Sequence, residues 1–295
     1  MTHHIQSLLL TLFLSLLTSL PTDAREVLNF DRGWLFCLGD TSAMAHPDYA
    51  DATWRQLNLP HDWAIEGDFS VDNPSGAGGG ALPGGIGWYR KHFTIPASLG
   101  NDDRLFITFD GVYMNSSVYI NGHLLGTRPY GYISFQYDLT PYLRRGADNV
   151  IAVRVDNSDQ PNSRWYSGCG IYRNVWLTTT SPLHIANWGV YVMPTTKNGR
   201  TWTVPVTVTL ADENHEGQHP MVRNTLFDSN GKIVAQVANG STGQQMTVRN
   251  PRLWSPDAPN VYTLLTEIII DNKTVDTVRT TTAFRSFRFD AKTGF

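Results

Sequence analysis

The sequence VRVDNSDQPNSRWYSGCGIYRNVWL, residues 153–177, decides how the rest of the chain is interpreted. An alternating apolar run at 150–155 leads into it and a second run at 171–177 leaves it, which predicts two strands. Between them lies a polar connection with Arg164, Trp165 and Tyr166 at its centre. The stretch therefore predicts an aromatic and cationic loop at one rim of a β-fold, suited to a flat polar ligand such as a sugar.

Length and composition set the broad class. The chain has 295 residues, a net charge of −3 and a hydrophobic fraction of 41%, which indicates about two domains, each with its own core. The near-neutral charge argues against nucleic acid or an anionic membrane as a partner. The nine tryptophans could fill β-cores or stack on sugar rings.

Residues 1–24 have the pattern of a signal peptide. An apolar run at 8–20 is followed by Pro21 and the small residue Ala24, although no Lys or Arg precedes the run. The run is shorter than the ~20 residues that a membrane-spanning helix needs. We therefore expect an exported protein, periplasmic or extracellular, that begins near Arg25 and has no membrane contact after cleavage.

Cys37 and Cys169 are the only cysteines. We expect two buried free thiols. Export would permit a disulfide between them, which is the alternative.

Residues 25–181 consist of short β-rich runs separated by turn residues, starting with an expected strand at 28–36. Asn121-Gly122 predicts a tight hairpin. The segment 66–87 is rich in glycine, as functional or disordered loops often are. Eight to ten expected strands favour an all-β, jelly-roll-like sandwich.

Residues 182–285 contain about seven short alternating runs, the pattern of an immunoglobulin-like sandwich. A new segment begins at 286 and the sequence stops at Phe295. Ten residues cannot form a third core, so we expect 286–295 to be the truncated start of another domain.

These runs carry several motifs in a specific order: LPHDW at 59–63, GGIGWYR at 84–90, VYING at 118–122, RWYSG at 164–168, GIYR at 170–173, LWSP at 253–256 and FRSFRF at 284–289. The mature chain thereby resembles the N-terminal part of glycoside hydrolase family 2, of the β-galactosidase kind. The resemblance implies a jelly-roll sugar-binding domain and an immunoglobulin-like domain, followed in the family by a catalytic (β/α)₈ barrel that supplies two glutamates. This sequence lacks the barrel, so we expect no catalytic residues and no activity from the chain alone.

Arg164 and Trp165 are the strongest candidates for ligand contact, since a guanidinium can bond two hydroxyls and an indole can cover a ring face. The alternative is that Trp165 packs beneath the loop while Arg164 neutralises Asp156 or Asp159. The resemblance implies that the loops with Arg164 and Asn73 contribute to the galactose pocket. Asp62 is a weaker candidate, because it could cap a turn.

Other chemistry has weaker support. Asp62 and Glu66 form the only carboxylate pair near the glycine-rich segment, and we do not expect them to be catalytic. His215 and His219 could suggest a metal site with nearby glutamates, but i,i+4 spacing aligns ligands only on a helix. We expect a polar hairpin tip there, and neither a metal nor a cofactor.

These observations predict part of a retaining β-galactosidase that acts in carbohydrate metabolism, with a β-galactoside and the missing barrel as partners. Two alternatives remain: a free-standing carbohydrate-binding module, and a docking piece for a separately encoded barrel chain.

Overall fold

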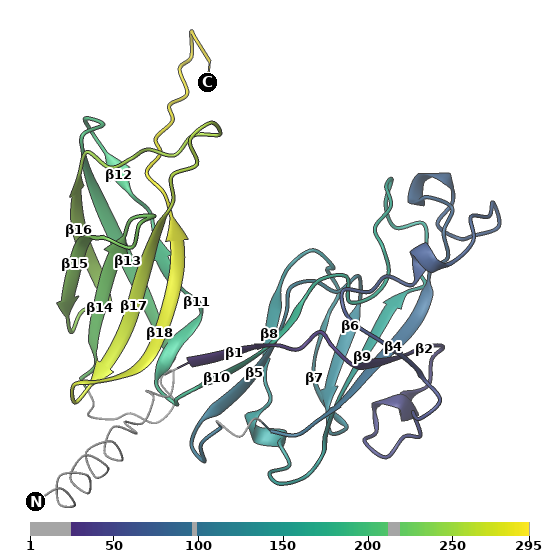
Figure 1. The fold of residues 1–295 in the computed structure, drawn as a ribbon. Coiled ribbons are helices and arrows are strands. Elements are labelled where there is room, and N and C mark those ends of the chain that lie inside the picture. The colour runs from purple at the N-terminus through teal and green to yellow at the C-terminus, as the bar shows by residue number, and fades with distance from the viewer. Residues whose placement is uncertain (1–24, 96–98, 212–218, 295) are drawn as a thin grey trace, which may run out of the picture.

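The chain folds into two consecutive β-sandwiches, as seen in a computed structural model that describes residues 25–95, 99–211 and 219–294 (Figure 1). The predicted all-β class is confirmed. The expected signal peptide at 1–24 and the polar connection with His215 lie outside the described residues. Within those residues, no helix is both long and apolar enough to span a membrane.

The first sandwich pairs a six-stranded sheet with a four-stranded sheet, and every neighbouring pair of strands is antiparallel. The larger sheet has the order β3-β2-β4-β9-β6-β7. Its strands are β2 (Trp34–Leu38), β3 (Arg55–Leu57), β4 (Gly85–Phe93), β6 (Ser116–Ile120), β7 (His123–Arg128) and β9 (Asn149–Asn157). The smaller sheet has the order β1-β10-β5-β8, with β1 (Arg25–Asn29), β5 (Arg104–Phe109), β8 (Phe135–Asp138) and β10 (Val175–Thr180).

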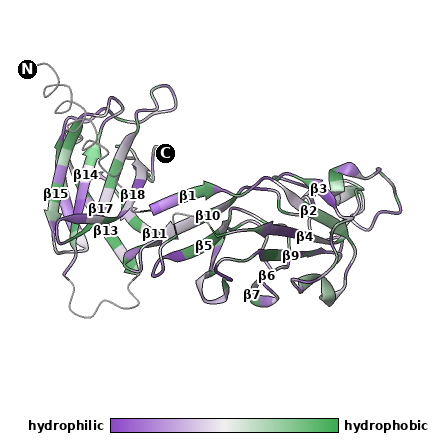
Figure 2. Ribbon diagram, turned by 60° about the horizontal axis from the view of Figure 1, so that its bottom comes forward, coloured by the Kyte–Doolittle hydropathy of each residue, from purple (hydrophilic) through white to green (hydrophobic). Residues whose placement is uncertain are grey.

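Strand periodicity explains why these segments enclose a core. On β5, Leu105, Ile107 and Phe109 are fully buried and alternate with half-buried neighbours. Hydrophobic and hydrophilic residues share strands in both sandwiches (Figure 2). Burial of each large apolar side chain contributes about 1.5–3 kcal/mol, so the alternation fixes which face of each strand meets the other sheet.

Two expected strands have different limits in the structure. The run at 28–36 is split into β1 and β2, because Asp31 accepts a hydrogen bond from the Val175 amide and Gly33 has a φ of +72°. There the chain passes from one sheet to the other. The run at 171–177 is a strand only from Val175. The predicted hairpin is confirmed: Asn121 and Gly122 have φ values of +51° and +86° and join β6 to β7.

The second sandwich also has two sheets. One contains β11 (His184–Val192), β12 (Thr195–Thr196), β13 (Thr201–Ala211) and β16 (Gly243–Arg249), with β13 paired to each of the others. The other has the order β15-β14-β17-β18, with β14 (Met221–Phe227), β15 (Ile233–Asn239), β17 (Tyr262–Ile270) and β18 (Lys273–Thr282). The last strand of this sheet, β18, is continuous to Thr282. Trp202 and Phe284 meet edge to face in the core, with ring centroids 5.4 Å apart.

An ion pair joins the two sandwiches. The Asp276 carboxylate is fully buried and accepts hydrogen bonds from Arg25 Nε and Nη2 at 2.9 and 2.8 Å. It also accepts one from the Ile185 amide at 2.6 Å. Arg25 belongs to β1 of the first sandwich, whereas Ile185 and Asp276 lie on β11 and β18 of the second. This contact therefore fixes the first strand of the chain against the second sandwich.

Candidate functional site

The central stretch forms a loop that connects the two sheets of the first sandwich. It leaves β9 in the larger sheet and returns as β10 in the smaller one. The glycine-rich segment projects nearby, shown in blue at one end of the first sandwich (Figure 1). We call the segments 61–84, 129–134 and 158–170 the rim.

Asp62 connects two segments of the rim. Its Oδ1 accepts hydrogen bonds from the Ala64 amide at 3.0 Å and the Cys169 amide at 2.8 Å, and its Oδ2 accepts one from the Tyr166 hydroxyl. Burial, together with the Asp62 carboxylate, raises the pKa of Tyr166, so the phenol stays protonated. Both oxygens of Asp62 are thus engaged in holding the 158–170 loop against residues 62–64.

Asn73 closes the glycine-rich segment. Its Nδ2 donates to the carbonyls of Asp68 at 2.9 Å and Ala81 at 2.8 Å. The segment lies against the neighbouring loop, because a Cβ on Gly78 would sit 3.8 Å from the Arg164 Cα. The structure therefore brings the loops of Asn73 and Arg164 together. The Asn73 amide group, however, donates its hydrogen bonds within its own loop.

Trp165 and Arg164 are the exposed part of the rim. Trp165 is 61% exposed, so it does not pack beneath the loop, and its Nε1 donates to the Tyr132 hydroxyl at 3.2 Å. Among the described residues, the exposed Arg164 guanidinium has no hydrogen bond or ion pair. Asp156 is instead bonded to Arg154 at 3.1 Å. The rim thus presents an open indole face beside an unpaired cation, which suits hydroxyl-rich rings.

Two tyrosines that the sequence reasoning missed extend this aromatic surface. Tyr130 and Tyr132 are exposed and lie edge to face with centroids 5.6 Å apart, and Tyr132 also contacts Tyr113 at 5.2 Å. Gly131 between them is required, because a Cβ there would be 2.3 Å from Tyr113. The signal in the sequence was the Tyr-Gly-Tyr triplet at 130–132.

Proton transfer is poorly supported at the rim. Glu66 is bonded to Arg55 at 2.8 Å and lies 3.3 Å from His61. Although burial alone would raise it, the Arg55 hydrogen bond and the neighbouring charges lower the pKa of Glu66. Burial lowers the pKa of His61. Near neutral pH this pair is an ionised carboxylate and a neutral imidazole, and Asp62 is occupied elsewhere, so the pair provides no general acid.

Neither cysteine adds a nucleophile to the rim. Both are free thiols, as expected, but only Cys169 is buried, whereas Cys37 is half-buried. The Cys169 thiol contacts Asn157 Nδ2 at 2.9 Å, and burial raises its pKa to about 12. Within the described ranges, no three His, Cys, Asp or Glu side chains are placed to hold a metal ion.

The rim is an open surface and not a deep pocket. The hollow between its loops, bordered by Trp165 and Tyr166, holds only about 10 Å³. A cavity needs roughly 10–15 Å³ for one water molecule, so a sugar could only lie across the outside of the loops.

Two sequence families match this chain. The profile of "Glycosyl hydrolases family 2, sugar binding domain" matches residues 29–181, and that of "Glycosyl hydrolases family 2" matches residues 183–285.

The chain is also similar to individual curated proteins and solved structures. It is 50% identical to the β-galactosidase BoGH2A of Bacteroides ovatus over 92% of its own length and 33% of that protein. It is 39% identical to a putative β-glucuronidase of Formosa agariphila, over 93% of this chain and 26% of that one. The crystal structure of a β-glycosidase from Bacteroides vulgatus superposes with a TM-score of 0.86 at 42% identity, covering 91% of this chain and 35% of that chain. The chain thus spans about a third or less of the length of the curated relatives it matches.

Proposed function

The chain belongs to glycosyl hydrolases family 2, and from this premise we propose that it is the carbohydrate-contacting part of a β-galactosidase. In this proposal the rim contacts a β-galactoside that a catalytic barrel hydrolyses. The 50% identity to a β-galactosidase supports the choice of sugar. The observation that carries the role of the rim is the exposed Trp165 beside the unpaired Arg164.

A hybrid enzyme tests this proposal. This chain would replace the matching third of the Bacteroides ovatus β-galactosidase, and hydrolysis of a chromogenic β-galactoside would be measured. We expect Trp165→Ala to raise KM about five- to tenfold with little change in kcat, because an aromatic–sugar contact formed in the ground state is lost. The control is Trp188→Ala, which removes an indole that is 67% exposed on β11 of the second sandwich. An unchanged KM in the Trp165 variant would contradict the proposal.

We also propose that the chain alone does not cleave galactosides. Of the rim carboxylates, Asp62 and Glu66 are both held by hydrogen bonds to neighbouring groups. The purified chain should show no turnover above buffer. Turnover that disappears in Glu66→Gln would overturn this expectation.

A carbohydrate-binding module is the second candidate, favoured by the same exposed indole. Calorimetric titration of the unmodified chain with galactosides separates the two functions. Saturable binding in the millimolar range or tighter, lost in Trp165→Ala and kept in Trp188→Ala, would favour a module. A docking piece would instead co-purify with a separately encoded barrel chain.

Export remains part of the proposal, supported by the apolar run at 8–20. N-terminal sequencing of the protein recovered outside the cytoplasm should find a start near Arg25. An intact Met1 on the recovered protein would exclude cleavage.

A further inference from the structure

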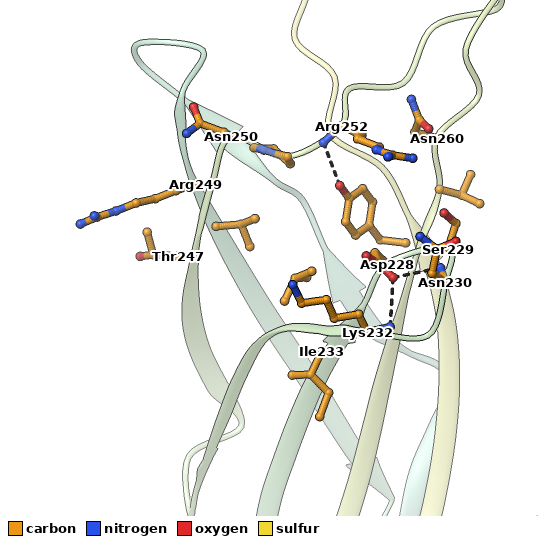
Figure 3. A pocket seen from close by; sticks show the side chains of 15 residues that line it. Asp228, Ser229, Asn230, Lys232, Ile233, Thr247, Arg249, Asn250, Arg252 and Asn260 are labelled. Carbon is orange, nitrogen blue, oxygen red and sulfur yellow. Dashed lines mark hydrogen bonds between the residues drawn. The ribbon is translucent and has the colours of Figure 1, made fainter.

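A much larger hollow lies in the second sandwich, far from the rim in sequence. It encloses about 660 Å³ between the start of β15 and the end of β16 (Figure 3). These are edge strands of different sheets, and Gln244 bonds to Asn239 and Ser241 where the chain connects them. The hollow lies at the opposite end of the two strands. We call it the β15–β16 cavity; its size falls within the ~300–1,000 Å³ usual for ligand pockets.

The floor and walls of the cavity are preformed. Tyr262 is buried at the floor, and its hydroxyl accepts a hydrogen bond from the Arg252 amide at 2.9 Å. That bond fixes the connection after β16 over the cavity. Apolar walls come from the side chains of Val234, Val248, Pro251 and Val261. A ligand would therefore find a shaped site that requires little ordering of the chain.

The charges around the cavity are unbalanced. Three cationic residues line it, Lys232, Arg249 and Arg252, against one carboxylate, Asp228. Asp228 Oδ1 accepts hydrogen bonds from the amides of Asn230 at 2.9 Å and Lys232 at 3.0 Å, and so is engaged in its own turn. Among the described residues, none of the three cationic side chains forms a hydrogen bond or an ion pair.

The three cations do not have equal access. In Figure 3, Lys232 lies across the cavity and Arg252 extends over the side where Asn260 lies, whereas Arg249 extends away from it. Two cationic side chains that form no ion pair among the described residues are thus available to a ligand. The third provides a control of the same charge and nearly the same location.

We propose that the β15–β16 cavity binds an acidic saccharide unit, a uronate whose carboxylate pairs with Lys232 while Arg252, on the side of Asn260, binds its ring hydroxyls. Uncharged donors and acceptors from Ser229, Asn230 and Thr247 also line the cavity and suit ring hydroxyls. The apolar walls suit the C–H face of a sugar ring, and the volume exceeds what a simple anion would fill. This site is separate from the rim and does not depend on the proposed function.

The test is a two-dimensional NMR titration of the ¹⁵N-labelled chain with galacturonate, glucuronate, galactose and inorganic phosphate. We expect saturable shifts at the Gly231, Val234 and Val248 amides with a uronate, and affinity at least about tenfold weaker for galactose, which has no charge to pair. Lys232→Gln and Arg252→Gln should each weaken uronate binding about three- to tenfold.

Two controls make the result specific. Arg249→Gln removes the same charge from a side chain directed away from the cavity and should change the affinity less than about twofold. Trp165→Ala should leave uronate binding unchanged, which separates this site from the rim. The proposal is wrong if galactose binds as well as uronate, if phosphate competes equally, if Arg249→Gln matches Lys232→Gln, or if no saturable shift occurs.

Discussion

The rim of the first sandwich and the β15–β16 cavity of the second differ in space and in how their polar side chains are paired. At the rim, Asp62, Asn73 and Glu66 are bonded to neighbouring groups, and the loops leave almost no internal space. At the cavity, Lys232 and Arg252 line about 660 Å³ and have no bonded partner among the described residues. A polar cluster that satisfies its own hydrogen bonds stabilises loops, whereas one that does not is available to a ligand.

Gly→Ala substitutions should give the largest difference between the two regions, measured as a loss in the free energy of unfolding. In Gly170→Ala the new Cβ would be 2.2 Å from the Tyr89 hydroxyl, at a φ of +122°. We expect a loss of about 3–5 kcal/mol in the free energy of unfolding of the first sandwich, measured by urea titration. Gly231→Ala beside the cavity has a φ of +78° but meets no atom within 4 Å, so it should cost about 1 kcal/mol. Equal losses would mean that the rim loops are not closely packed.

Salt should weaken ligand binding at the cavity more than ligand binding at the rim. Uronate affinity at the cavity rests on uncompensated charge, so raising NaCl from about 0.05 to about 0.5 M should weaken it about fivefold. Galactoside binding at the rim rests on aromatic contact and should change less than about twofold. Parallel calorimetric titrations measure both. Equal salt dependence would show that the two sites do not differ in the way their charges suggest.

The effect of acid on Glu66 at the rim should be the smallest of the three. The folded state lowers the pKa of Glu66, so its contribution to stability is present above its ordinary value of 4.5 and is lost as pH falls through the lower folded-state pKa. The side chain is 44% exposed, so screening should keep this contribution below about 1 kcal/mol. At pH 6 the wild type should have a higher unfolding temperature than Glu66→Gln, and the difference in unfolding temperature should shrink towards pH 3. A gap that stays constant over this range would contradict the assignment.

The sequence was informative where structure depends on local pattern. Strand periodicity predicted both sandwiches. Asn121-Gly122 predicted a hairpin, because Asn and Gly readily adopt the left-handed backbone conformation that a tight turn requires. It was less informative about limits. Asp31 and Gly33 divide the segment 28–36, which was expected to be one strand. The sequence did not show this because the Val175 amide that donates to Asp31 is 144 residues away.

The candidate sites show the same division. The sequence suggested Arg164 and Trp165 as candidates by residue type, and the alternative in which Trp165 packs beneath its loop does not fit its exposure. It did not identify Tyr132 as the partner of Trp165, because a contact across 33 residues leaves no local pattern. The β15–β16 cavity was missed for a similar reason. In the sequence its cations look like ordinary surface charges. Only the structure shows that they lie where β15 and β16 separate.

The Arg25–Asp276 pair has a practical consequence for anyone who shortens the N-terminus. A recombinant protein begun at Glu26 would keep most of the pairing of β1 with β10, but it would leave the enclosed Asp276 carboxylate without its counter-charge. The contact between β1 and the second sandwich would be weaker. Spin-label distances between the rim and the β15–β16 cavity should therefore be measured in proteins that retain Arg25.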